Sequence, residues 1–372
     1  MATTYAHTNT VYKLLKKPAA VIAIGIIGIT TLIAVFAYCF APDSTPNANR
    51  MIIELSAKEP GFSKQLLHIP KKNSTETGNF FNGLFNGEVS TYAAIPINKY
   101  WFTQDELVVA HYIDDGIEDT LSFNIVELAV NNDAKQSAEE YISHELVKAT
   151  TFYLGTDRYG RDILSRLLIG ARVSLAVGFI AVLLSLTIGI ILGSLAGFYG
   201  GIIDNTIMWL INILWAIPTL LLVFAITLTI GKGFWQIFIA IGLTMWVSAA
   251  RLIRGQVMAI KEMEYITAAK ALGYSNTRVI YRHILPNIAG PVMVIAASNF
   301  ATAILIEAGL SFLGIGVQPP MPSWGLMIKE HYNFLLTNRP LLAIIPGLAI
   351  MLLVYAFNVL GNALRDVLDV RA

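Results

Sequence analysis

Glu307 is an acidic side chain that lies well inside an apolar stretch of the chain, and Ser311 follows one helical turn later. A carboxylate in such a stretch is costly in a bilayer unless it faces a wet cavity or a hydrogen-bonding partner. It could line or gate the path of a solute and meet the solute's amino group. It could equally make a structural hydrogen bond to a neighbouring helix or to the segment around Trp324. The residue types leave both interpretations open.

The chain carries no pattern for nucleotide hydrolysis or other catalysis. A phosphate-binding loop reads Gly-x-x-x-x-Gly-Lys-Ser/Thr. Here Gly231-Lys232 is followed by Gly233, and Ile226 stands where the first glycine should be. The six histidines show no metal-ligand spacing, and no Ser–His–Asp or His-Glu-x-x-His arrangement occurs. We therefore expect no catalytic residue, no metal site and no cofactor in this chain.

The elements that must position these residues are membrane spans. Of the 372 residues, 55% are hydrophobic and 14% are charged, against about 25% charged in an ordinary soluble protein. A spanning helix needs about 20 apolar residues. Six stretches qualify: Ala19–Phe40, Val173–Gly197, Ile207–Ile230, Phe234–Ala250, Ile288–Leu310 and Leu341–Leu360. The composition excludes a plain cytosolic enzyme.

Glycine and proline residues within these spans predict how the spans pack and where they bend. Glycine recurs every fourth residue at Gly189, Gly193 and Gly197, which allows close approach of a neighbouring helix. Pro218 and Pro346 lie inside spans and should kink them, because proline has no backbone donor.

Basic residues near the span ends predict the orientation. Three lysines (Lys13, Lys16 and Lys17) precede the first span and place the N-terminus in the cytoplasm. The connection 251–287 carries six basic against two acidic residues and is expected inside, as is the C-terminus with Arg365 and Arg371. Arginines at 158, 161, 166 and 172 would then lie outside. Long translocated loops are largely exempt from the charge rule, so the topology stands.

The segment 41–150 differs from the rest of the chain. It holds 16 acidic and 8 basic residues, against 9 acidic and 18 basic elsewhere. Alternation at Leu121, Phe123 and Ile125 and the run 107–109 predict strands, and the aromatic residues 100–102 could seed a core. We expect a small α+β domain outside the membrane, with its acidity forming a solvated face. The predicted division is 1–40, 41–150 and 151–372.

The inner connection has the features of a docking element. Its alanines favour a helix from about Glu264, and Gly273 can end that helix in a left-handed cap. A second short helix should run from Ser275, a good N-cap, towards Pro286 before the chain re-enters the membrane. A surface loop without a partner would explain the charge but not the small residues. The candidate docking residues are Glu264, Ala268, Ala269, Gly273, Arg278, Arg282, Leu285 and Pro286.

A cluster of charge precedes the second span. Asp157, Arg158, Arg161 and Asp162 are expected to form an ion-paired amphipathic helix on the outer surface. For this cluster and for Trp324, a structural or receptor-docking role is favoured over substrate binding.

Four segments in order resemble one family. Ala268-Ala269, Gly273 and Ile284-Leu285-Pro286 resemble the EAA loop of ABC importer permeases, which docks on the ATPase subunit, although Thr267 replaces the glutamate of the general motif. The other three resemble the C-type subunits of the dipeptide/oligopeptide permease family. They are Gly155-Thr156-Asp157 with Gly160-Arg161-Asp162, Ser165-Arg166 with Gly170–Leu175, and Glu307–Gly314 followed by Pro319-Pro320 and Pro322–Gly325. The acidic insert lies outside the resemblance.

The resemblance implies an all-α polytopic membrane protein with six transmembrane helices of the ABC importer permease type, interrupted by the α+β insert after the first. It implies a permease subunit for di- or oligopeptides in the bacterial cytoplasmic (inner) membrane. The implied partners are a homologous second permease, two cytoplasmic subunits that bind ATP and Mg, an extracytoplasmic substrate-binding protein and membrane lipid, with no nucleic acid. Related permeases handle dipeptides, longer peptides, nickel complexes or glutathione, so the substrate stays open.

Two other functional classes fit the sequence less well. A stand-alone secondary transporter or channel would need coupling acids at mid-membrane and usually internal repeats, and the sequence shows neither. A membrane-anchored receptor or assembly factor would leave the inner docking element unexplained.

Overall fold

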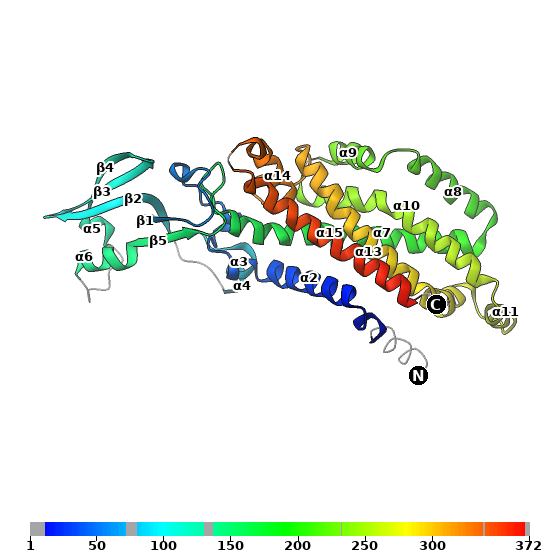
Figure 1. Cartoon of the computed structure of the whole chain (residues 1–372). Helices are drawn as coiled ribbons and strands as arrows, with labels where there is room; N and C mark the ends of the chain where they lie inside the picture. The colour runs from blue at the N-terminus through cyan, green and yellow to red at the C-terminus, as the bar shows by residue number, and fades with distance from the viewer. Residues whose placement is uncertain (1–11, 72–79, 130–136, 232, 338, 369–372) are drawn as a thin grey trace.

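The chain forms a bundle of long helices with a small sheet domain at one end (Figure 1). The computed structural model describes residues 12–71, 80–129, 137–231, 233–337 and 339–368.

Five helical segments of the described chain are long and apolar enough to cross a membrane. Each coincides with a predicted stretch. They are α2 (Pro18–Val35), α7 (Ile163–Tyr199), α10 (Phe234–Lys261), the run Asn276–Phe312 and α15 (Leu341–Leu368). The first predicted span is shorter than expected, because α2 breaks at Phe36 before the short α3 (Ala37–Phe40).

The predicted span Ile207–Ile230 is not one straight helix. The chain forms α8 (Gly201–Trp215) and α9 (Thr219–Ile230), which meet at an angle of 92°. Pro218 cannot donate a backbone hydrogen bond and disfavours helical geometry in the residue before it, so the helix stops there. The predicted kink is thus a complete break. The described chain has five helical segments that are long and apolar enough to span a membrane, or six if this pair crosses as one. Pro346, by contrast, lies within the continuous α15.

The glycine repeat on α7 packs against α10, as predicted. A Cβ atom on Gly193 would lie 2.6 Å from the carbonyl oxygen of Ala250, and one on Gly197 would lie 2.7 Å from that of Arg254. Gly189 meets Ala249 in the same way. Any larger residue would push the two backbones apart, so these glycines set the spacing of the central helix pair.

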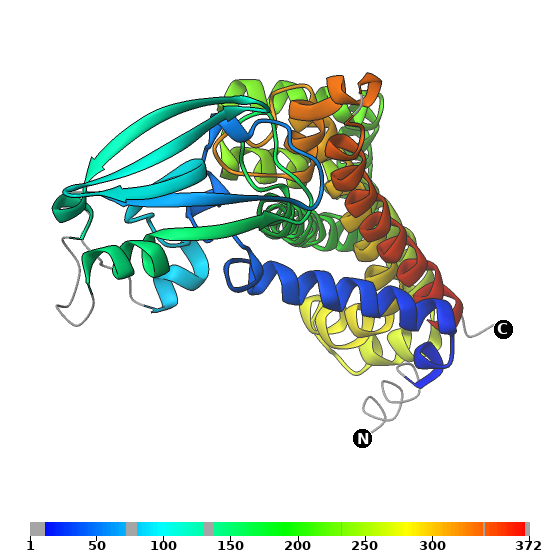
Figure 2. The ribbon, with the colours of Figure 1, turned by 60° about the vertical axis from the view of Figure 1, so that its left-hand side comes forward.

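The two ends of the bundle differ. The start of α2 and the end of α15 lie at the end that carries α11 (Glu264–Ala271), and the sheet lies at the other end (Figures 1 and 2). Lys17 and Asp366 form an ion pair of 2.8 Å across the two termini. The termini and the inner connection therefore share one side of the bundle.

The segment after α3 folds as an α+β domain, as the alternation predicted. Its strands are β1 (Phe62–Pro70), β2 (Tyr92–Thr103), β3 (Glu106–Asp114), β4 (Ile117–Asn124) and β5 (Val147–Phe152). They form one antiparallel sheet in the order β4-β3-β2-β1-β5. The short helices are α4 (Phe80–Asn86), α5 (Ile125–Leu128), α6 (Ala138–Tyr141) and a π-helical turn Ile142–Leu146.

The sheet has a core on each face. Leu67, Ile97, Leu107 and Val109 pack under α5 and the π-helical turn, and a smaller cluster around Leu55, Leu66 and Tyr112 fills the opposite face. Tyr100 and Phe102 join the larger core, but the predicted third member, Trp101, is 47% exposed. Successive strand residues point to opposite faces, so three consecutive aromatic residues cannot share one core.

Candidate functional site

The inner connection begins with a helix that ends as the sequence predicted. Gly273 has φ +79°, and two backbone hydrogen bonds close the turn: Gly273 N–H donates to the Lys270 carbonyl at 2.9 Å, and Tyr274 N–H donates to the Ala269 carbonyl at 3.2 Å. This is a Schellman cap, which satisfies the last carbonyls of α11. The Tyr274 ring then lies on the Arg278 guanidinium at 4.3 Å. The turn at the end of α11 is therefore held by its own backbone hydrogen bonds.

The candidate docking residues divide between two faces of the element. Ala269 is buried with Ile266 and Val279 in a core that joins α10 and α13 (Leu285–Phe312), so it holds the element to the bundle. Leu285 packs against the same core. The exposed residues of the set are Glu264, Ala268, Gly273, Arg278, Arg282 and Pro286. These six side chains or backbones are free to contact another protein.

The sequence did not reveal which apolar residues of this surface are exposed, and Leu272 and Tyr281 are the most exposed of them. Leu272 and Tyr281 are each 74% exposed at the end of the bundle that carries the basic residues. They add exposed apolar area to the surface that carries the candidate docking residues. The available signal was that Leu272 directly precedes the glycine that ends α11.

The second helix of the connection starts as predicted but does not end at Pro286. The Ser275 side chain accepts a hydrogen bond from Arg278 N–H and caps α12 (Asn276–Val279). The chain then continues through a π-helical turn, Ile280–Ile284, directly into α13 (Leu285–Phe312). Pro286 lies at the junction where the π-helical turn ends and α13 begins. A movement of α12 would therefore be passed directly to α13.

The charged cluster before α7 is buried except for the exposed Arg158, and it is not a helix. Asp157 and Arg161 are 0% and 1% exposed, in a turn made possible by Gly160 at φ +72°. The Arg161 Nε donates to Asp157 Oδ2 at 2.6 Å, and its Nη2 donates to Glu330 Oε2 at 2.9 Å. Arg166, fully buried, lies 3.5 Å from the same Glu330 oxygen. The predicted outer amphipathic helix is wrong, because the partner of this cluster is α14 (Trp324–His331), far along the chain.

The same cluster brings together Asp157, Glu330 and His331, whose possible ligand atoms lie within 4.8 Å of one another. Burial lowers the pKa of His331 below its ordinary value. Both carboxylates, however, are paired with Arg161 and Arg166. Two guanidinium charges therefore stand where a cation would have to enter. The arrangement favours an ion-paired joint over a metal site.

Asp162 and Trp324 are also buried and make internal bonds. Asp162 Oδ2 accepts from Ser165 N–H at 2.7 Å and so caps the start of α7. Burial raises the pKa of Asp162, while the bonds from Ser165 oppose that rise. Trp324 Nε1 donates to the Leu167 carbonyl at 2.9 Å. Of the two roles left open for these residues, the geometry favours the structural one.

Glu307 is fully buried within this chain. The Ser311 hydroxyl donates to Glu307 Oε1 at 2.6 Å and accepts from Val317 N–H at 3.1 Å. The start of α14 packs close by, since a Cβ atom on Gly325 would lie 2.5 Å from the Ala308 Cα. Glu307 and Ser311 thus join α13 to the turn and helix that follow it.

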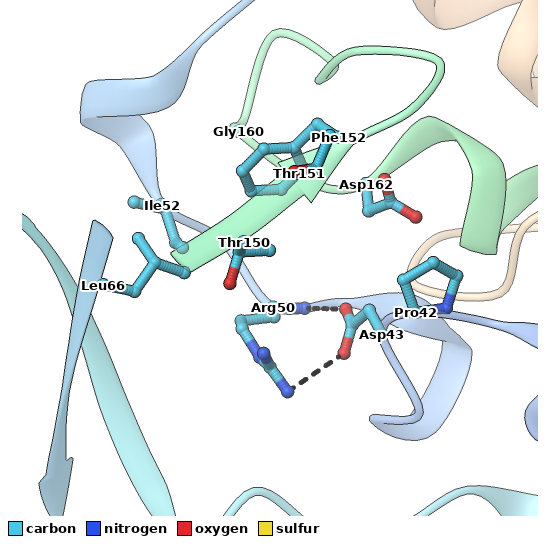
Figure 3. Close-up of a pocket in the computed structure, with 10 residues that line it drawn as sticks. All are labelled: Pro42, Asp43, Arg50, Ile52, Leu66, Thr150, Thr151, Phe152, Gly160 and Asp162. Atoms are coloured by element: carbon cyan, nitrogen blue, oxygen red, sulfur yellow. Dashed lines mark hydrogen bonds and ion pairs between the residues drawn. The ribbon is translucent and has the colours of Figure 1, made fainter. Parts of the chain in front are cut away.

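A small pocket lies where the sheet domain meets α7 (Figure 3). Asp43 and Arg50 pair across it at 3.5 Å, beside Asp162. Its volume is about 30 Å³, room for about two water-sized spheres. It is too small for a solute such as a peptide. It is a gap in the contact between the sheet domain and the start of α7.

Comparisons with known proteins point to one family. Residues 189–372 match the family described as binding-protein-dependent transport system inner membrane component. The chain is 40% identical over 235 residues to the glutathione transport system permease protein GsiD of Pectobacterium atrosepticum, covering 62% of this chain and 78% of that one. It is 45% identical over 217 residues to the dipeptide transport system permease protein DppC of Alkalihalophilus pseudofirmus, covering 58% and 71%. An inward-facing MetNI methionine ABC transporter structure aligns over 54% of this chain and 96% of that one, at 20% identity and a TM-score of 0.45, too low to support a conclusion.

Proposed function

This chain belongs to the family of binding-protein-dependent transport system inner membrane components, and we propose that the importer it serves takes up di- or oligopeptides. The chain itself is the permease subunit of an ABC importer and a multi-pass protein of the inner membrane. The peptide assignment is supported by relatives named for dipeptide and oligopeptide transport. A relative named for glutathione transport fits the same class, because glutathione is itself a small peptide.

The proposed topology puts both termini and the inner connection in the cytoplasm, and residues 41–150 outside the membrane as an insert between 1–40 and 151–372. It is supported by the shared end of the two termini and α11. The basic residues of that end favour the cytoplasmic side. A count of six spans requires that α8 and α9 cross as one broken span.

One observation carries the proposed mechanism: the capped α11–Gly273 element lies at one end of the bundle and exposes Ala268, Leu272 and Arg278. We propose that a cytoplasmic ATPase docks there, with a second ATPase on a homologous permease. These subunits bind ATP and Mg, and an extracytoplasmic binding protein delivers the peptide.

Coupling follows from the continuity of the helices. Closure of the ATPases on ATP would move α11, and the unbroken run from Asn276 to Phe312 would pass that movement to the outer end of the bundle. ATP can drive this change only by binding more tightly to one of the two states.

Glu307 and Ser311 are proposed to gate the outer end through their hydrogen bond. Glu307→Gln keeps the size and an acceptor oxygen for the Ser311 hydroxyl but replaces the acidic group with an amide. We expect about a fivefold loss of uptake rate with an unchanged melting midpoint. Uptake kinetics equal to those of the parent would contradict a gate and leave only the structural role.

The proposed function is tested by uptake of a labelled peptide into vesicles that hold the assembled complex. Accumulation should require ATP, the ATPases and the binding protein. Accumulation by this chain alone would contradict the proposal.

A further inference from the structure

A polar groove opens on the bundle beside the α8–α9 break. Its volume is about 310 Å³, and it lies between that break and the faces of α10 and α13. Six of the lining side chains are polar: Thr219, Thr244, Ser248, Ser298, Asn299 and Thr302. A volume of this size is at the lower end of the range for ligand sites.

The groove is a poor surface for lipid. Ser248, Ser298 and Thr302 are exposed along helices that have the length and composition of spans. A single hydroxyl in such a helix can bond to its own backbone and needs no wet surroundings. Here, however, the three hydroxyls gather around one groove with Thr219, Thr244 and Asn299. The break at Ala216–Pro218 adds a second argument, because non-helical backbone at membrane depth is tolerated only inside protein or beside water.

A second cavity of the bundle differs from the polar groove in its lining. It measures about 440 Å³ and is lined almost wholly by apolar side chains of α2, α7, α13 and α15, including Phe179 and Phe300. Its single charged residue, Arg172, donates to the carbonyl oxygens of Ala34, Val35 and Phe85. That cavity suits lipid chains, whereas the polar groove suits a hydrogen-bonding solute.

The polar atoms of the groove are mostly acceptors. The hydroxyls of Thr302, Ser248 and Thr244 each donate to a carbonyl of their own helix at 2.8–3.0 Å, which leaves their oxygen lone pairs for a ligand. Asn299 donates from Nδ2 to Ser185 Oγ at 3.2 Å, so its side chain is oriented by α7. The lining includes no charged residue.

We propose that this groove is the part of the solute path that contacts the peptide backbone, with hydroxyl and amide oxygens accepting from the peptide's N–H groups. The proposal rests on the proposed function. Uncharged acceptors can bind the backbone N–H groups that all peptides have, and they do not select for charge on the peptide's side chains. Glu307 does not line this groove, so gating and contact with the peptide fall to different faces of α13.

The test is protection of a single cysteine in the assembled complex. Cys39 is the one cysteine of the chain, so Cys39→Ser is the parent. Ser298→Cys lies in the groove at the middle of α13, and Thr187→Cys is the matched control. Thr187 is also exposed and bonded to its own helix, but it lies on α7 away from the groove.

We expect a charged, membrane-impermeant methanethiosulfonate to label Ser298→Cys at least tenfold faster than Thr187→Cys. Trialanine delivered by the binding protein with ATP should slow the first reaction severalfold. Equal labelling of the two variants, or labelling that trialanine leaves unchanged while the parent imports trialanine, would overturn this proposal alone. Failure of the parent to import trialanine would overturn the proposed function and this proposal with it.

Discussion

Gly273→Trp is expected to abolish peptide uptake, to less than about a tenth of the parent rate, while ATP hydrolysis continues. At φ +79°, a Cβ atom on residue 273 would have no neighbour within 4 Å in this chain. The indole would therefore project from the exposed surface beside Leu272, where the ATPase is proposed to dock. The measurement is the ratio of peptide imported to ATP hydrolysed in reconstituted vesicles.

Gly273→Asn is the matched control. Asparagine adopts the left-handed conformation more readily than other non-glycine residues and adds little bulk, so most of the coupling should remain. A Gly273→Trp complex with a normal import ratio would contradict the docking assignment. Equal loss in both variants would mean that the backbone of the cap, and not the docking surface, had been damaged.

Arg161→Ala is expected to destabilise the protein strongly. The side chain is 2% exposed and pairs with Asp157 and Glu330, so its removal leaves buried carboxylates without that partner. Breaking a buried pair in this way costs about 3–5 kcal/mol. The thermal melting midpoint of the purified subunit in mild detergent measures the loss.

Lys17→Ala supplies the control for that prediction. The Lys17–Asp366 pair has a similar length of 2.8 Å, but its side chains are 40% and 62% exposed, and exposed pairs contribute about 0–1 kcal/mol. Arg161→Ala/Asp157→Ala should lose less than the sum of the two single variants, since the partners are in contact. A melting midpoint for Arg161→Ala as high as that for Lys17→Ala would show that the cluster does not hold the joint.

Features that depend on neighbours in sequence were predictable. Hydropathy located α7, α10, α13 and α15, because an apolar run of about 20 residues is long enough to form a helix that spans a membrane. The caps at Gly273 and Ser275 were predictable for the same local reason. The glycine spacing on α7 predicted its close packing, although not that α10 is the partner.

Features that depend on residues far apart in the sequence could not be predicted. The i, i+4 spacing of Asp157 and Arg161 is equally a helix pattern, and only Glu330, 169 residues beyond Arg161, makes it a buried joint. Hydropathy records composition without direction, so it could not show the 92° turn at Pro218. The polar groove escaped prediction because its residues come from three parts of the chain, each with only a few polar side chains among many apolar ones.

The most direct test of the central claim is uptake of labelled trialanine by vesicles that contain this chain, its partner permease and both ATPases. With the binding protein outside and ATP available to the ATPases, we predict that trialanine accumulates above its external concentration. Uptake should stop when ATP, the ATPases or the binding protein is left out. Accumulation by this chain alone, driven by an ion gradient and indifferent to ATP, would contradict the account and identify a secondary transporter.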